Sequence, residues 1–196
     1  MNLQHIQIKI FASAPASLNL DPFLAIFARW RKEKDHPAQW VDLADYAHML
    51  RGPGVVLVGQ LCNFSFDLAP PQPGILYYAR KGLSGSPQER ISSAFRSCFE
   101  LSKRLVAEKE YPPSAPLQTD RIAIRFSDRL DIPNTTSTDK ELRPPVVEVL
   151  NALFGPQGYE LSPQSDPAEC YGFFVKAKKA EPLNILLDRM ASATKA

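Results

Sequence analysis

The order of the predicted elements constrains the fold of this chain more than any other feature, because it occurs twice. A strand, a helix, a pair of strands and a second helix are predicted from residue 3 to about 110, and again from about 120 to 190. Proline suits the first turn of a helix, since its φ is fixed near the helical value and its missing N–H would have no partner there. Each predicted helix starts at such a proline: Asp21-Pro22, Ser86-Pro87, Arg143-Pro144 and Glu181-Pro182.

This order predicts an α+β fold in which two tandem ferredoxin-like βαββα units form a mainly antiparallel sheet with helices packed on one face. The first half is assigned to residues 1–111, which include an extra hairpin formed by residues 62–68 and 75–80, and the second half to residues 117–191. The proline-rich stretch between them is the best candidate for a linker. A chain of 196 residues is long enough for two half-domains or for one fused domain.

Hydrophobic periodicity supports the individual strands and helices. Ile6, Ile8 and Ile10 alternate with polar residues, as in a half-buried strand. Residues 40–46 fit a strand or a short helix, and a strand is preferred because the second half has one at the matching place. Near Gly59 a run that is apolar at every position becomes alternating, which predicts a bulge or bend.

The helices also carry end signals. Ser86 and Glu89 have the spacing of a capping box, in which each side chain satisfies a backbone donor of the other. A long polar loop is predicted from Ser127 to Lys140, followed by a helix from Pro144 to Phe154. The last helix is predicted over residues 182–190.

Composition indicates an ordinary globular protein without a strong overall field. The chain is 44% hydrophobic and 22% charged, and its net charge of +2 gives no strong attraction for nucleic acid or an anionic membrane. Three scattered cysteines favour neither a disulfide framework nor a zinc site, so a reducing cytoplasm is expected. No signal peptide and no membrane-spanning stretch is predicted.

One group of candidate catalytic residues lies around a histidine. Asp45 precedes His48 by three residues, and a histidine beside a carboxylate can act as a general base. An enzyme using this pair together with Asp128 and Arg129 is therefore one hypothesis. A surface histidine hydrogen-bonded to Asp45 is favoured over it. No phosphate-binding, hydrolase or metal-binding motif occurs, so no metal and no cofactor is predicted.

The long loop after the first strand of the second half offers a second candidate site. It contains Asn134 and Thr135 among several polar residues, and polar loops on a rigid sheet often bind ligands. The simpler interpretation is a solvated connection in which these side chains make turn hydrogen bonds, and this interpretation is favoured.

The face of the sheet away from the helices is the third candidate. Its predicted outward positions combine basic and aromatic side chains, as single-stranded RNA-binding sheets do. The candidate residues are Lys9, Tyr78, Arg80, Arg121, Arg125, Phe174 and Lys176. The aromatic triplet of an RNA-recognition domain is missing. The preferred interpretation is therefore that a second copy of the chain, or another protein, packs on this face of the sheet.

Three segments resemble a family of uncharacterised bacterial proteins of about this length: residues 45–48, 52–59 and 128–135. The resemblance covers most of the chain, but it implies no activity, cofactor or substrate. Together with the absence of a catalytic motif, it leaves a non-enzymatic binding or assembly module as the leading hypothesis. A homo-oligomer or a protein partner is expected, with nucleic acid as a weaker alternative.

Overall fold

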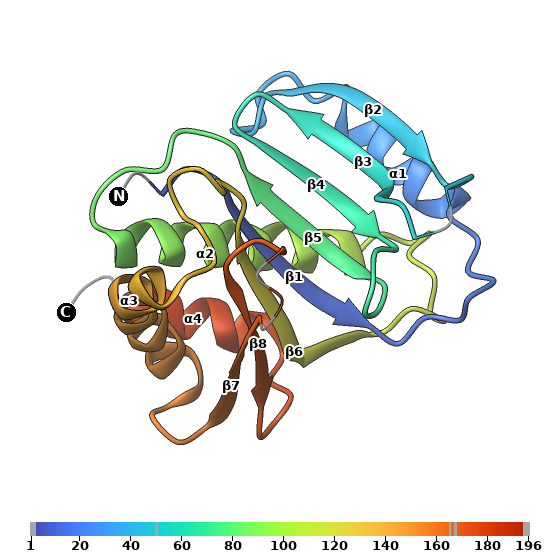
Figure 1. Cartoon of the computed structure of the whole chain (residues 1–196). Helices are drawn as coiled ribbons and strands as arrows, with labels where there is room; N and C mark the ends of the chain where they lie inside the picture. Colours follow the sequence, from blue (N-terminus) through green and yellow to red (C-terminus); the bar gives the residue numbers. More distant parts are fainter. Residues whose placement is uncertain (1–2, 50, 165, 167, 194–196) are drawn as a thin grey trace.

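The protein is an α+β structure built on one antiparallel sheet (Figure 1). The computed structural model describes residues 3–49, 51–164, 166 and 168–193. Within these residues eight strands follow the spatial order β2-β3-β4-β5-β1-β6-β8-β7, and every neighbouring pair is antiparallel. The strands are β1 Ile6–Ala12, β2 Trp40–Tyr46, β3 Gly54–Gly59, β4 Cys62–Asp67, β5 Gly74–Ala79, β6 Leu117–Phe126, β7 Tyr159–Pro163 and β8 Gly172–Ala177. The predicted fold class and antiparallel sheet are thus confirmed.

The helices in the described parts of the chain are α1 Asp21–Trp30, α2 Pro87–Val106, α3 Thr136–Phe154 and α4 Leu183–Ala193. In the view of Figure 1, the helices labelled α1, α2 and α4 lie behind the sheet and cover one of its faces, while α3 is seen nearly end-on at its left margin. Helix α1 packs on β2 and β3, and α2 packs on β1 and β5, while α3 and α4 pack on α2 and on each other. None of these helices combines the length and the apolar composition that crossing a membrane requires.

The pairing of β1 with β6 joins the two halves of the chain. Ile8 lies opposite Ile124 in this pair, and both side chains are fully buried toward the helices. In each half, the strand that precedes the second helix pairs with the first strand: β5 with β1, and β8 with β6. One continuous core therefore extends through both halves.

Residues 40–46 form the strand β2, as predicted, and the bend predicted near Gly59 is present as a hairpin turn. The register of β2 against β3 also shifts at this place, between Trp40 and Asp42. Strand β3 ends at Gly59, and β4 returns beside it with Val58 opposite Asn63. The turn needs a glycine, because a Cβ at residue 59 would lie 2.7 Å from the carbonyl oxygens of Ala38 and Cys62. The abrupt change of periodicity therefore marks a reversal of the chain.

Helix α3 begins eight residues earlier than the predicted start at Pro144. Its N-cap is Thr135, whose side chain accepts a hydrogen bond from the backbone N–H of Thr138. Pro144 and Pro145 lie inside the helix, where Pro144 is exposed, so solvent can satisfy a carbonyl that a proline leaves free. The polar loop after β6 is correspondingly shorter than predicted. The capping box at the start of α2 is present as predicted.

Candidate functional site

Strand register places the predicted basic and aromatic residues on one face of the sheet. We call this the open face, because the helices lie on the other side (Figure 1). Side chains at alternate positions of β1, opposite to the buried isoleucines, point to it. One row across the strands is Asn63, Tyr78, Gln7 and Arg125, and the next is Ser65, Leu76, Lys9, Ala123 and Phe174. Arg121, in the middle of β6, lies opposite Lys176, near the end of β8.

A buried ion pair occupies the middle of the open face. The Nζ of Lys9 lies 2.7 Å from Oδ2 of Asp67 and also donates to the carbonyl oxygen of Ala69 at 2.7 Å. Both charged residues are 4% exposed. Burial lowers the pKa of Lys9, Asp67 opposes this shift, and the nearby Arg125 adds to it. The centre of the face thus contains two cations and one carboxylate.

Unpaired cations flank an aromatic ring on β6 and β8. Phe174 lies opposite the small Ala123, with Arg121 and Lys176 on one side along the strands and Arg125 on the other. The Cα atoms of Arg121 and Arg125 are about 13 Å apart, because a strand rises about 3.3 Å per residue. Within the described residues, none of these three cations has an ion-pair partner, although Glu160 of β7 lies directly opposite Lys176. The ring of Phe174 stacks on Phe11, with centroids 6.4 Å apart.

Two of the buried polar atoms that lack a hydrogen-bond partner in the described part of the chain lie at positions of the open face. They are Oδ1 of Asn63, on the same row as Tyr78 and Arg125, and Oγ of Ser127, at the end of β6. Buried polar groups normally have a partner, and such an atom invites a bound water or ligand group. The open face therefore offers both free positive charge and unused hydrogen-bonding capacity.

Asp128 meets His5 at one end of the open face. Nδ1 of His5 lies 3.8 Å from Oδ2 of Asp128, which is an electrostatic contact rather than a hydrogen bond. The ring of His5 also meets the edge of Tyr78, with centroids 6.2 Å apart. Burial raises the pKa of Tyr78, Arg80 opposes this, and Cys170 and Asp128 add to it. Four elements therefore converge here, but no aligned base and nucleophile results.

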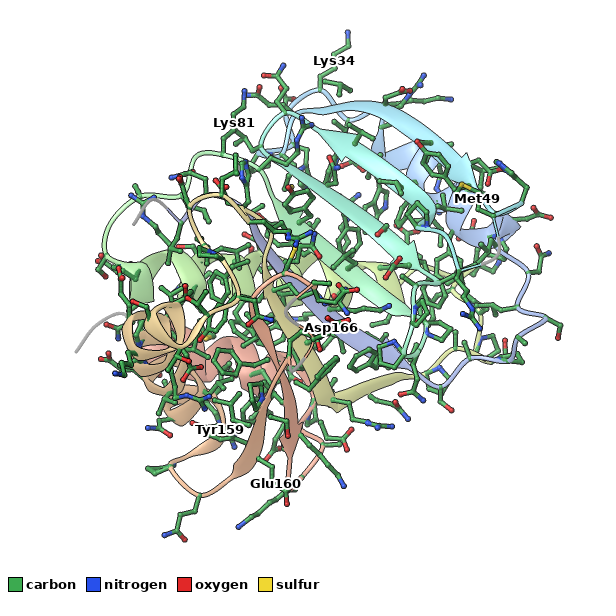
Figure 2. The ribbon with its side chains drawn as sticks, viewed as in Figure 1. Lys34, Met49, Lys81, Tyr159, Glu160 and Asp166 are labelled. Carbon is green, nitrogen blue, oxygen red and sulfur yellow. The ribbon has the colours of Figure 1, made fainter. Side chains whose placement is uncertain are left out.

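The structure does not bring His48 to Asp128. Asp45 lies on the edge strand β2 and His48 in the turn that follows it, whereas Asp128 follows β6, five strand spacings or about 24 Å along the sheet. Met49, next to His48, is labelled at the outer edge of the sheet in Figure 2. Oδ1 of Asp45 accepts from the backbone N–H of Ala47, as in an ordinary turn. The hypothesis of one shared catalytic site thus loses its geometric basis.

Three predicted site residues make bonds that hold loops in place. Asn134 donates to the carbonyl oxygens of Gln164 and Asp166 at 3.3 and 2.9 Å, which ties together the loops after β6 and β7 (Figure 2). Thr135 caps α3. Arg80 donates to the carbonyl oxygen of Gly59 at 3.3 Å. Arg129 is exposed at the start of the first of these loops.

Sequence reasoning missed a cavity of about 260 Å³ on the helix side that contains titratable side chains, because its lining comes from distant segments. Its lining includes Cys62, Tyr77 and Ser97, and the Tyr77 phenol interacts with the other two side chains. Burial raises the pKa of the Cys62 thiol to about 11, and burial also raises that of Tyr77. A protonated thiol is a poor nucleophile, so this cluster does not suggest covalent catalysis.

The described residues contain no group of three or more side chains suited to hold a metal ion. Comparison of the chain with protein-family models, with curated proteins and with solved structures gave no match. Geometry alone therefore supports the functional argument, and among the described residues the open face combines cations that have no ion-pair partner with unsatisfied polar atoms.

Proposed function

We propose that this protein is a non-enzymatic binding module that takes single-stranded nucleic acid on the open face of its sheet. The observation that carries the proposal is the position of Phe174 between unpaired cations, Arg121 and Lys176 on one side and Arg125 on the other. A base can stack on the ring while the phosphates on either side of it pair with the cations. Ala123 beside the ring is buried, so a base would stack on the part of the half-buried Phe174 ring that is exposed.

A ligand bound on the open face would interact with the local charge of that face rather than with the net charge of the whole chain. A net charge of +2 describes 196 residues, whereas three cations without ion-pair partners in the described residues gather on two adjacent strands. Salt dependence of binding reports the number of phosphates neutralised locally. The near-neutral composition is therefore compatible with a local phosphate site.

A second copy of the protein fits this face less well than an anionic partner does. Face-to-face association would bring the unpaired cations of both copies into one desolvated interface, where like charges repel. Large exposed apolar side chains would favour such an association, but those in the middle of the face are half-buried: Val56, Val58, Leu76 and Phe174. The more exposed Tyr46 lies on the edge strand β2. We therefore expect a monomer at micromolar concentration in a light-scattering mass measurement.

The direct test is fluorescence anisotropy with a labelled oligouridine. The wild-type protein should bind it saturably at low salt. Arg125→Glu should weaken binding about tenfold or more, and Phe174→Ala should weaken it about fivefold or more through lost stacking. Lys140→Glu is the matched control, because Lys140 is exposed on α3, among the helices, and should bind like wild type.

Two outcomes would reject nucleic acid as the partner. One is the absence of saturable binding at about 50 mM salt, where phosphate contacts are strong. The other is equal affinity for oligouridine and polyglutamate, since recognition of charge alone would assign the face to acidic proteins. Equal dissociation constants for Arg125→Glu and Lys140→Glu would place any binding elsewhere on the molecule.

The finer architectural predictions also remain proposals. The matching placement of β5 beside β1 and of β8 beside β6 supports two ferredoxin-like βαββα halves that arose by tandem duplication. On this correspondence, the extra hairpin of the first half is β2 and β3, and not the hairpin of residues 62–68 and 75–80 that the sequence predicts. Membership in the uncharacterised bacterial family and a cytoplasmic location are likewise proposals. Three free cysteines support the cytoplasmic location.

A further inference from the structure

An apolar groove of about 530 Å³ lies where the end of α2 meets the proline-rich segment and the starts of β6 and α4. It is separate from the open face, because α2 and α4 belong to the helix layer. Its apolar lining is Val106, Tyr111, Pro113, Pro116, Leu117 and Leu183. This volume is within the usual range for sites that bind small molecules.

The wall of the groove is held in place before any ligand arrives. The Tyr111 hydroxyl donates to the carbonyl oxygen of Ala115 at 2.6 Å, across the proline-rich segment. The Tyr111 ring meets Phe23 of α1 edge-on, with centroids 5.8 Å apart. The backbone N–H of Ser13 donates to the carbonyl oxygen of Pro116. A preformed wall reduces the ordering cost of binding.

The charge of the groove selects the kind of ligand. Lys103 is the single charged residue of the lining and has no ion-pair partner in the described part of the chain. No carboxylate lines the groove, while Thr119 and Asn184 supply neutral hydrogen-bonding groups. Val106 is 38% exposed at the groove wall, although water is an unfavourable neighbour for its side chain. An apolar body with one negative charge complements this lining.

We propose that this groove binds a small carboxylic acid with an apolar chain or ring. The apolar body lies along Val106, Leu117 and Leu183, and the carboxylate pairs with the Lys103 ammonium. Thr119 and Asn184 hydrogen-bond to the head group. The site goes beyond the nucleic-acid-binding function and does not depend on it, since it uses different residues and a different layer of the fold.

Isothermal titration calorimetry with decanoate tests the proposal. The intact chain should bind one decanoate saturably. Lys103→Ala should weaken binding about tenfold, as expected for the loss of a charge-assisted contact. Val106→Glu should abolish it, because a like charge then lines the groove. Both positions are exposed on α2, so these changes should leave the fold intact. Lys140→Ala is the matched control and should bind like wild type.

Decanol separates the charge from the apolar body. It should bind wild type and Lys103→Ala equally, and more weakly than wild type binds decanoate. Absence of saturable decanoate binding, or equal affinity of Lys103→Ala and Lys140→Ala, would overturn the proposal. Decanoate should leave oligouridine affinity unchanged. Competition between the two would instead show decanoate on the open face and also reject the groove.

Discussion

At the scale of single residues, the buried ion pair of Lys9 and Asp67 is the least expected feature of the open face. The partners are 58 positions apart in sequence and lie on strands that are not neighbours, β1 and β4. Desolvating two charges offsets much of their attraction, so such a pair is weak evidence for stability. Because Lys9 also binds the carbonyl oxygen of Ala69, we infer that the pair fixes the segment after β4 against β1.

Replacing one partner of this pair should be much more damaging than replacing both. Asp67→Asn leaves the Lys9 ammonium buried without its counter-charge and should lower the free energy of unfolding by about 3–5 kcal/mol. The double variant Lys9→Met with Asp67→Leu should be close to wild type. Urea unfolding at pH 7 measures both, and equal losses in the single and double variants would contradict this account.

The free energy of unfolding measured at alkaline pH gives a second test of the same pair. The pKa of Lys9 in the folded state is lowered below its unfolded-state value of 10.5. At a pH between these two pKa values, the unfolded chain therefore binds more protons than the folded one. Stability contributed by this group therefore rises with pH through that window. The deficit of Asp67→Asn should shrink as the pH rises, because a neutral amine no longer needs the carboxylate.

Period-two alternation in β1 and β8 was enough to place Lys9 and Phe174 on the outward face. It could not identify Asp67 as the partner of Lys9, because that contact depends on strand order. Asn134 and Thr135 attracted notice through their polarity, yet their bonds cap a helix and join two loops. Capping and ligand binding use the same side-chain types, so composition alone does not separate them.

At the scale of elements, one carboxylate links α3 to the sheet. Asp139, in the first turn of α3, accepts two hydrogen bonds from Arg143 at 2.8 and 2.9 Å and one from the Tyr171 hydroxyl at 3.0 Å. Tyr171 precedes β8 and is 2% exposed. The hydrogen bond from Arg143 is the largest cause of the lowered pKa of Asp139. The link holds the start of the helix against the second half of the sheet.

Asp139→Asn should lower the free energy of unfolding by about 1–3 kcal/mol at neutral pH, as expected for hydrogen bonds to a charged group. The carboxylate has a folded-state pKa below 3.8, so its contribution is present above 3.8 and is lost as the pH falls through the folded value. The difference between variant and wild type should therefore disappear in acid. Asp131→Asn, in the exposed loop, is the control, and an equal effect there would contradict the link.

Element types could be predicted wherever the periodicity was long and regular, as in α2 with its capping box. The start of α3 was misplaced because Pro144 matches the usual first-turn signal, whereas the cap at Thr135 lies in a polar run without apolar periodicity. Near Gly59 the pattern recorded a change of strand, but a single sequence does not distinguish a bulge from a tight reversal. The misplaced start of α3 concerns a boundary rather than the existence of the element.

At the scale of the whole molecule, the β1–β6 pair makes the two halves one body. Strands from both halves share the sheet, and helices from both halves pack on one core. Trp30 and Trp40, the only tryptophans of the chain, both lie in the first half and are 1% and 7% exposed. Tryptophan fluorescence therefore reports the first half, whereas far-ultraviolet circular dichroism reports both.

The two signals should give coincident urea unfolding curves, because neither half can leave the shared sheet alone. Ile124→Ala, a change in the second half, should lower the free energy of unfolding by about 2–5 kcal/mol and shift the fluorescence midpoint of the first half equally. A fluorescence midpoint that Ile124→Ala leaves in place, or two separated transitions, would show independent halves.

The central position of β1 has a consequence for biosynthesis. A ribosome makes this strand before either of its neighbours: β5 begins at residue 74 and β6 at residue 117. The apolar side of β1 must therefore stay without its final pairing partners while most of the chain is still being translated. Contacts of such long sequence separation slow the search for the native arrangement. The nascent polypeptide is thus a natural client for chaperones that shield extended apolar segments.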